Sequence, residues 1–218
     1  MKRSLREWLL RIAVLLLGLT VAHLGVSLFL LSDLGSDPFN VFVQGLFRTL
    51  DKALRWPFLT HGRTHVAVSL LIILILLFAD RSYIKIGTAL CMIFGGPIID
   101  FFSALLSPLL AGAGLPVRIC LLVAGCVILA FGMTIVIRSD AGTGPNDLVA
   151  LVLSEKRGWP FSRTRVCVDA LFALLGFLLG GVVGAGTLVC MFLVGPVAGV
   201  FLPVNGRWIE RLIRALCP

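Results

Sequence analysis

The sequence predicts an all-α polytopic membrane protein with six transmembrane helices. We expect these helices to form two inverted three-helix repeats, each with a short half-helix after an S-D-x-G-[S/T]-x-P motif. Three observations lead to this prediction: the hydropathy of the chain, a duplicated motif and the placement of the basic residues. Of the 218 residues, 59% are hydrophobic and 14% are charged, with a mean hydropathy of +1.05. Because soluble domains carry about 25% charged residues, this composition excludes an ordinary soluble fold.

The duplicated motif is the most polar interruption of the apolar chain. Residues 32–40 read SDLGSDPFN and residues 139–147 read SDAGTGPND, and each copy directly follows a long apolar run. A backbone that leaves a membrane helix needs special chemistry at that point, because lipid cannot satisfy its polar groups. We predict that the two copies face each other and form the working site of the protein.

The first repeat covers about residues 8–110 of a single predicted membrane domain, residues 1–218. Its first apolar run exceeds the roughly 20 residues that cross a bilayer and is too long for a signal-peptide core, so we expect a retained helix. The segment after the motif proline is too short to span a bilayer at about 1.5 Å per residue. The predicted elements are a span over 8–31, a half-helix over 38–50, and spans over 64–79 and 88–110, the last interrupted at Gly95-Gly96-Pro97.

The second repeat, about residues 116–203, has the same layout. The predicted elements are a span over 116–137, a half-helix from Pro145, and spans over 164–180 and 187–203, the last interrupted at Gly195-Pro196. In the tail, residues 206–218, apolar residues occupy one helical face and charged residues the other. That pattern is typical of a helix that lies on the membrane surface.

The internal repeat is visible residue by residue. Gly25, Ser32, Asp33, Gly35 and Pro38 recur 107 positions later as Gly132, Ser139, Asp140, Gly142 and Pro145. Arg63-Thr64 recurs as Arg163-Thr164, and a GTxxCMxxxGP pattern begins at both Gly87 and Gly186. Matches that keep their order along the chain indicate a true duplication. Because each repeat has three crossings, the second copy must be inserted upside down relative to the first.

The basic residues test this topology independently. With the N-terminus inside, fourteen of the nineteen Lys and Arg residues fall on the inner side. This bias predicts a multi-pass protein of the bacterial inner membrane with both termini in the cytoplasm. The same bias accounts for the net charge of +8 without a nucleic-acid partner. Inverted repeats with broken helices are typical of secondary transporters, which bind substrate near the bilayer midplane.

At these motifs the chain resembles the YczE/YitT-like bacterial membrane proteins, and especially their YczE-like branch. The resemblance covers roughly residues 24–203 and is carried by residues 32–38 and 140–147, with Gly186-Thr187 and Gly195-Pro196. The chain departs from the family at Phe39-Asn40, where relatives more often carry Trp-Asp. The resemblance implies a six-helix membrane protein, and the function of that family is largely unassigned.

The motif residues are the candidates for substrate binding. Their glycines allow positive φ and close approach of the backbone, and a carboxylate near hydrocarbon is costly unless it has a function. The predicted binding residues are Ser32, Asp33, Gly35, Asn40, Ser139, Asp140, Gly142, Thr143, Asn146 and Asp147. The alternatives stay open: the glycines permit tight turns; capping alone explains Asp37; Asp147 and Asn40 sit where a first-turn side chain can cap; and Asp140 pairs with Arg138.

Ion coupling and hinge motion have their own candidates. We assign proton or ion coupling to Asp100, Asp33 and Asp140, and hinge motion to Gly96, Pro97, Gly195 and Pro196. Asp169 follows Arg165 by four residues, which predicts an ion pair on one helix. The half-helix N-termini offer about half a positive charge each against full carboxylate charges, so the balance favours a cation, a zwitterion or a proton-coupled solute.

The remaining features assign no other chemistry. The sequence has neither a catalytic motif nor a metal-ligand spacing, so we expect no enzyme activity, no metal and no cofactor. Gly176, Gly180 and Gly184 allow close helix packing, within the chain or in a homodimer. We therefore expect a transporter of a small solute that contacts the lipid bilayer. The alternative is a scaffold or regulatory partner of another membrane complex.

Overall fold

The structure is a computed structural model that describes residues 4–56, 58–110 and 112–217. Within these residues it is all helical, without strands. Its elements are α1 (Leu5–Leu31), α2 (Pro38–Leu54), α3 (His61–Ala79), a 3-10 turn η1 (Arg81–Tyr83), α4 (Ile86–Leu110), α5 (Leu115–Ser139), α6 (Pro145–Arg157), α7 (Phe161–Leu178) and α8 (Ala185–Leu216).

Long apolar helices confirm a polytopic membrane protein. Among the described residues, five helices are long and apolar enough to cross a membrane: α1, α3, α4, α5 and α8. Helix α7 occupies the place of the remaining predicted span, but its 18 residues include Arg163, Arg165 and Asp169. Helix α7 is therefore not among the five helices that qualify by length and composition.

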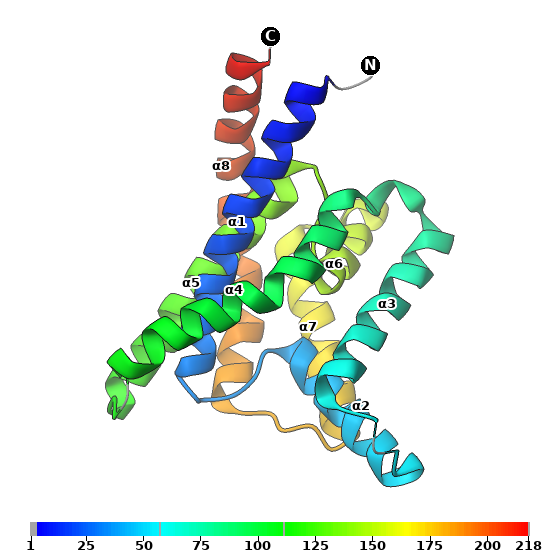
Figure 1. The fold of residues 1–218 in the computed structure, drawn as a ribbon, viewed down its shortest axis with the longest axis vertical. Helices are drawn as coiled ribbons and strands as arrows, with labels where there is room; N and C mark the ends of the chain where they lie inside the picture. The colour runs from blue at the N-terminus through cyan, green and yellow to red at the C-terminus, as the bar shows by residue number, and fades with distance from the viewer. Residues whose placement is uncertain (1–3, 57, 111, 218) are drawn as a thin grey trace.

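Helices α1 and α5 form an antiparallel pair at the centre of the bundle, with α8 beside α5 (Figure 1). Glycines let the first pair approach closely. A Cβ at Gly25 would lie 2.3 Å from the backbone nitrogen of Leu129, and one at Gly132 would lie 2.2 Å from that of Ala22. The sequence repeat therefore places equivalent glycines at the contact between the first helices of the two repeats. The start of α1 and the end of α8 lie at the same end of the bundle.

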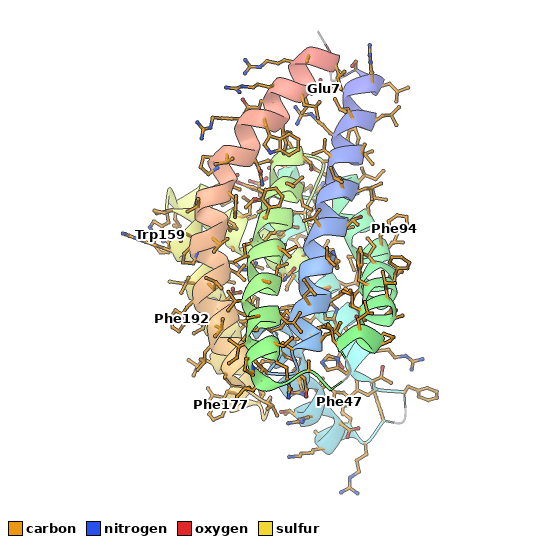
Figure 2. The ribbon with its side chains drawn as sticks, turned by 90° about the vertical axis from the view of Figure 1, so that its left-hand side faces the viewer. Glu7, Phe47, Phe94, Trp159, Phe177 and Phe192 are labelled. Atoms are coloured by element: carbon orange, nitrogen blue, oxygen red, sulfur yellow. The ribbon has the colours of Figure 1, made fainter. Side chains whose placement is uncertain are left out.

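The last two helices of each repeat are arranged differently. Helix α7 packs against α8, whereas α3 and α4 diverge from the turn that joins them (Figure 1). The outer surface is strongly apolar: Phe94, Phe177 and Phe192 point away from the bundle in Figure 2, and Phe192 is 61% exposed. Such a surface suits contact with lipid.

The structure corrects two boundary predictions. Pro97 and Pro196 lie inside continuous helices, so neither Gly-Pro step interrupts its span. A proline removes one helical hydrogen bond, and the rest of a membrane helix remains in place because lipid offers no alternative partner. The predicted tail, 206–218, is not a separate surface helix over its described part: α8 continues to Leu216. The apolar face of that part contributes Ile209 to a buried cluster.

Candidate functional site

The two motif turns lie at opposite ends of the bundle. Asp33 follows the end of α1, whereas Ser139 and Asp140 contact Arg11 near its beginning. The helix between Arg11 and Asp33 spans about 30 Å, at about 1.5 Å per residue. The prediction that the complete motifs face each other is therefore wrong for their turn residues. The antiparallel packing of α1 on α5 keeps the ends of these helices apart.

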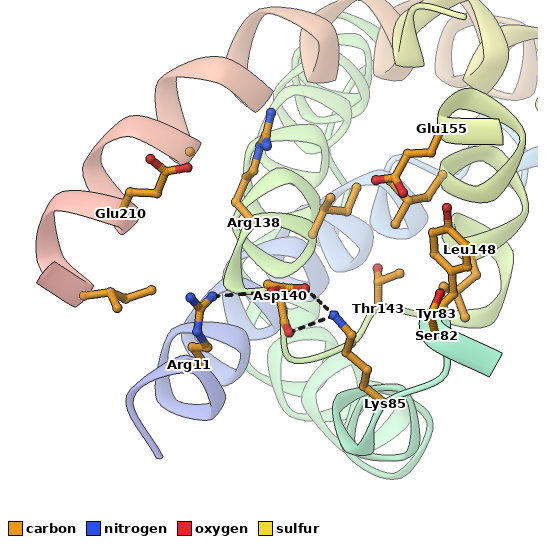
Figure 3. Close-up of a pocket in the computed structure, with 15 residues that line it drawn as sticks. Arg11, Ser82, Tyr83, Lys85, Arg138, Asp140, Thr143, Leu148, Glu155 and Glu210 are labelled. Carbon is orange, nitrogen blue, oxygen red and sulfur yellow. Dashed lines mark hydrogen bonds and ion pairs between the residues drawn. The ribbon is translucent and has the colours of Figure 1, made fainter. Parts of the chain in front are cut away.

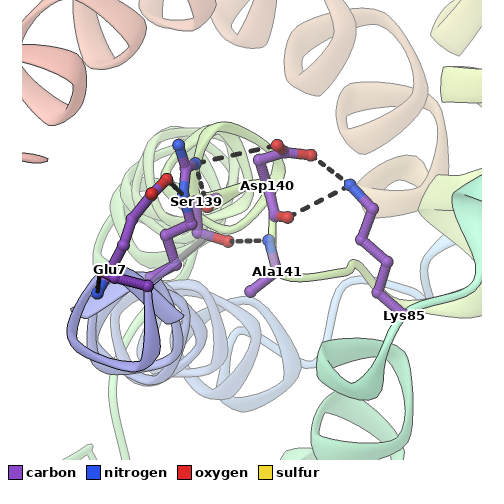
Figure 4. Close-up of polar contacts among 7 residues, drawn as sticks. Glu7, Lys85, Ser139, Asp140 and Ala141 are labelled. Carbon is purple, nitrogen blue, oxygen red and sulfur yellow. Dashed lines mark hydrogen bonds and ion pairs between the residues drawn. The ribbon is translucent and has the colours of Figure 1, made fainter. Parts of the chain in front are cut away.

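The second motif turn is held by basic residues from α1 and from the start of α4 (Figure 4). Arg11 donates a 3.0 Å hydrogen bond to the Ser139 carbonyl and lies 3.8 Å from the Asp140 carboxylate. Lys85 pairs with the same carboxylate and bonds the Asp140 carbonyl at 3.2 Å. The Gly87 amide donates to the Ala141 carbonyl at 2.9 Å. The turn thus joins both helices.

The first motif turn is held in an equivalent way. Arg118, which lies 107 positions after Arg11, donates to the Ser32 carbonyl at 2.6 Å. It also donates to the carbonyl and the carboxylate of Asp33, at 2.7 and 2.8 Å. The Gly186 amide donates to the Leu34 carbonyl at 2.8 Å, as Gly87 does at the other turn. Asp33 itself is 90% exposed, so it lines no interior site.

A cavity of about 480 Å³ adjoins the second motif turn (Figure 3). Its polar lining includes Arg11, Tyr83, Lys85, Arg138, Asp140, Thr143, Glu155 and Glu210. A hydrogen bond to Glu155, with a smaller contribution from burial, raises the pKa of Tyr83 to about 12. Hydrogen bonds from Ser82 lower the pKa of Asp80 on the same turn. This region lies outside the spans and ties η1 to α6.

The second halves of the motifs converge on a different, central cavity. It has a volume of about 430 Å³ and lies between the N-termini of α2 and α6. Asp37 and Asn40 reach it from α2, and Asn146 and Asp147 reach it from α6. Asp37 caps α2, because its carboxylate accepts hydrogen bonds from the backbone N–H of Asn40 at 3.2 Å and from the side-chain Nδ2 of Asn40 at 2.5 Å.

A buried arginine joins the half-helix α6 to α7. Arg165 lies 2.5 Å from the Asp147 carboxylate and 2.9 Å from that of Asp169, one turn along α7. The side chains of Arg165 and Asp169 are 9% and 2% exposed. The predicted ion pair is confirmed, and the structure adds Asp147 to it. A buried charge cluster of this kind is costly unless it is fully paired or functional.

The remaining wall of the central cavity comes from α1, α3, α4, α5 and α8. It includes His23, His61, His65, Cys91, Cys190, Met92, Met133 and Phe29. His65 meets Phe39 edge-on with ring centroids 5.2 Å apart. Across the described part of the chain, no group of three His, Cys, Asp or Glu side chains could hold a metal ion.

The central cavity divides the predicted site residues into two groups. Asn40, Asn146 and Asp147 line it together, and Gly96 of the hinge set lines it too. The predicted residues that lie elsewhere are Ser32, Asp33, Gly35, Ser139, Asp140, Gly142 and Thr143, which stay at the two turns, and Pro97, Gly195 and Pro196, which lie in α4 and α8. Asp100 is exposed on α4, one helical turn beyond Gly96.

Sequence reasoning missed that Asp37 and Arg165 line this cavity. Asp37 was explained by capping alone, although its position at the half-helix N-terminus also places it at the cavity. Arg165 and Asp169 had a usable signal, because an ion pair inside an apolar span is a functional candidate by default. His61 and His65 are four residues apart, but no sequence pattern links them to His23 on α1.

The comparisons with known proteins identify a family and relatives without an assigned activity. Residues 9–203 match the Family of unknown function (DUF6198). The chain is 28% identical to the uncharacterized membrane protein YczE of Bacillus subtilis, over 91% of this chain and 88% of that one. It is 27% identical to an uncharacterized protein of Haemophilus influenzae, over 90% and 85%. It is 28% identical to the uncharacterized protein YyaS of Bacillus subtilis, over 88% and 92%. No solved structure gives a significant match.

Proposed function

Because the chain belongs to the DUF6198 family of unknown function, its activity has to be argued from its site, and we propose that it is an inner-membrane transporter of a small solute. The solute binds in the central cavity between α2 and α6. Helix α7 is the sixth span, with Arg165 lining this cavity, and both termini lie in the cytoplasm. Proton or cation coupling belongs to the same proposal.

One observation carries the proposal: two half-helices begin at the same cavity inside an apolar bundle, and both bring polar side chains to it. Transporters bind substrate at such places, because the first turns of broken helices leave amide groups free for a ligand. The cavity volume of about 430 Å³ lies within the range of small-molecule sites. Helix packing alone gives no reason to keep Arg165 and its carboxylates there.

The inverted-repeat topology draws support from the exchanged contacts. Each motif turn is held by the first helix of the other repeat, through Arg118 at one end and Arg11 at the other. A carbonyl of each turn also accepts a hydrogen bond from a backbone amide in the third span of the other repeat, that of Gly186 or Gly87. Equivalent contacts at opposite ends are what two repeats of opposite orientation produce.

The cavity is open at one end. His61 and Gly62, at the start of α3, line it and are exposed. Toward the other end, Lys85 pairs with Asp140 and ties α4 to the second motif turn. With the termini in the cytoplasm, the open end faces outward. The arrangement corresponds to one state of an alternating-access cycle.

Uptake into proteoliposomes tests the proposal. Wild-type protein is compared with Asp147→Asn, which removes a carboxylate from the cavity, and with Asp51→Asn, an exposed carboxylate near the end of α2. We expect saturable uptake of at least one solute from a broad metabolite and cation panel, lost in Asp147→Asn and kept in Asp51→Asn. Wild-type liposomes as tight as empty ones to the whole panel contradict transport and favour the scaffold alternative.

A further inference from the structure

The central cavity carries more negative than positive charge. Asp37 and Asp147 line it, Asp169 lies directly behind it, and Arg165 is the only Lys or Arg among its described lining residues. The N-termini of α2 and α6 together add about one positive charge. About one negative charge therefore remains unbalanced, since the histidines add charge only when protonated. Inside a membrane protein such an imbalance favours a cation.

The imbalance is concentrated at Asp37. Arg165 is already engaged by Asp147 and Asp169, at 2.5 and 2.9 Å. Asp37 receives hydrogen bonds from Asn40, a neutral donor, and no ion pair of Asp37 occurs among the described residues. A cationic group in the cavity would therefore bind next to Asp37, where its charge is not yet compensated.

The rest of the cavity suits a hydrocarbon body rather than a bare ion. Leu19, Phe29, Phe39 and Met133 form apolar wall. A volume of about 430 Å³ is far larger than a bare metal ion needs, and the described residues offer no three-ligand group. We propose that the substrate class is a small organic cation: an ammonium group beside Asp37 and an apolar body against these walls. This proposal rests on the proposed function.

A matched pair of probes isolates the charge. Thermal unfolding of the purified protein is measured with n-hexylammonium and with hexanoate, which share their hydrocarbon chain and differ in charge. We expect hexylammonium to raise the Tm of wild type and of Asp51→Asn, with the shift lost in Asp37→Asn, and hexanoate to raise it in none. Because each variant is compared with its own ligand-free Tm, a change in its stability does not enter the result.

Two results overturn the substrate class. They are a Tm shift with hexanoate equal to or above that with hexylammonium, and no hexylammonium shift in wild type. Saturable, Asp147-dependent uptake of any other solute in the liposome assay would then keep the proposed transport function. Its absence would remove that function as well, so the two failures are distinguishable.

A second inference comes from an independent comparison between the repeats. Helices α7 and α8 meet through small residues: a Cβ at Gly195 would lie 2.7 Å from the Ser162 carbonyl oxygen, and one at Gly199 would lie 2.9 Å from the Ser162 Cβ. The repeat pattern pairs Ser162 with Gly62 and Gly195 with Gly96. At Gly62 and Gly96 an added Cβ would meet nothing within 4 Å.

Gly62 lies on α3 and Gly96 on α4, the two helices that diverge. The same repeat pattern pairs Gly199 with Asp100. In the second repeat the larger residue, Ser162, is on the first helix of the pair and lies opposite Gly199. In the first repeat the larger residue, Asp100, is on the second helix, and its counterpart is Gly62. The smaller residue on one helix compensates for the larger one on the other. Glycines at matching places are what a close helix contact requires.

We infer that the protein has a second state in which α3 closes on α4, as α7 closes on α8 here. Closure brings Gly62 against Asp100 and covers the mouth of the central cavity at His61 and His65. By the equivalence of the repeats, α7 then separates from α8 and opens the cavity toward the other side. This inference rests on the proposed function and assigns Asp100 a place in it.

Cysteine cross-linking tests the closure. The pair Ser162→Cys and Gly199→Cys is the positive control, because a Cβ at Gly199 would lie 2.9 Å from that of Ser162 and a small separation brings the pair to the roughly 3.5–4.5 Å of a disulfide. The pair Gly62→Cys and Asp100→Cys is the test, in native membranes under mild oxidant, with each single variant controlling for the native cysteines. We expect both pairs to form an intramolecular disulfide, identified by peptide mass spectrometry.

Function supplies the second readout. Oxidation of the Ser162–Gly199 pair should stop uptake, because α7 can no longer leave α8, and reductant should restore it. A control pair that cross-links while the Gly62–Asp100 pair does not, with and without hexylammonium, overturns the closure. Uptake that continues unchanged in the cross-linked control pair also overturns it, and in that case transport itself stands.

Discussion

The two motif turns share a sequence pattern, yet the structure satisfies their polar groups to different degrees. At the first turn, the Thr187 hydroxyl donates to the Ser36 carbonyl at 2.6 Å and accepts from the Gly184 amide at 3.2 Å. At the second turn, the equivalent hydroxyl of Thr88 is buried and finds no hydrogen-bond partner in the described part of the chain, and the same holds for Thr143. One sequence motif therefore gives a satisfied threonine hydroxyl at the first turn and two unsatisfied ones at the second.

The largest expected difference concerns the motif glycines. Gly142 and Gly35 both have positive φ, 139° and 150°, so alanine strains either backbone. A Cβ at Gly142 would lie 2.5 Å from the Thr88 nitrogen, whereas one at Gly35 would lie 3.0 Å from the Thr187 nitrogen. We expect Gly142→Ala to cost about 3 kcal/mol or more and Gly35→Ala about 1–2 kcal/mol. Thermal unfolding in detergent measures both; an equal or larger loss for Gly35→Ala contradicts the comparison.

The arginines that hold the turns come next. Among the described residues, Arg118 alone supplies side-chain donors to the carbonyls of Ser32 and Asp33, whereas Arg11 shares the second turn with Lys85. We expect Arg118→Ala to lower the free energy of unfolding by about 2 kcal/mol and Arg11→Ala by about 1 kcal/mol. Arg118→Lys is the matched control, since it keeps the charge and loses the fork of donors. A greater loss at Arg11 would show that Lys85 does not share the role.

The hydroxyls sharpen the comparison further. Valine in place of Thr187 removes two hydrogen bonds and leaves the Ser36 carbonyl without that donor, so we expect a loss of about 1–2 kcal/mol. Valine in place of Thr88 removes a hydroxyl that has no partner, and we expect no loss or a small gain. Unfolding of the two variants side by side decides this. A comparable loss at Thr88 would indicate that its hydroxyl is satisfied by water.

The smallest expected effect is the pH dependence at the second end. The hydrogen bond to Glu155 raises the pKa of Tyr83 from 10.0 to about 12. A group with a raised pKa of this kind stabilises the fold in its protonated form, so the contribution is present below pH 10 and is lost as pH rises toward about 12. We expect Tyr83→Phe to remove this part of the alkaline slope of Tm, and an unchanged slope contradicts the assignment.

Local signals predicted the elements well. Pro38 and Pro145 begin the half-helices as predicted, because proline at the first helical position costs no hydrogen bond. Asp37 caps α2 as a residue before that proline should. The predicted interruptions at the Gly-Pro steps were wrong, because a proline inside a long apolar helix bends or weakens the helix locally without ending it. The continuation of α8 to Leu216 depends on the packing of Ile209 and Ile213 against Val14 and Ile135, which local sequence signals do not show.

The sequence alone determined the membrane class, the all-helical content, the starts of the half-helices and the residue correspondence between repeats. These follow from hydropathy, backbone stereochemistry and duplication, which act locally or along the chain. Only the tertiary structure decided that the second halves of the motifs meet at one cavity while their first halves lie at opposite ends. That outcome depends on the antiparallel contact of α1 with α5 through Gly25 and Gly132, and on Arg165 reaching from α7 to Asp147. Such contacts join residues far apart in sequence, where spacing carries no information about distance.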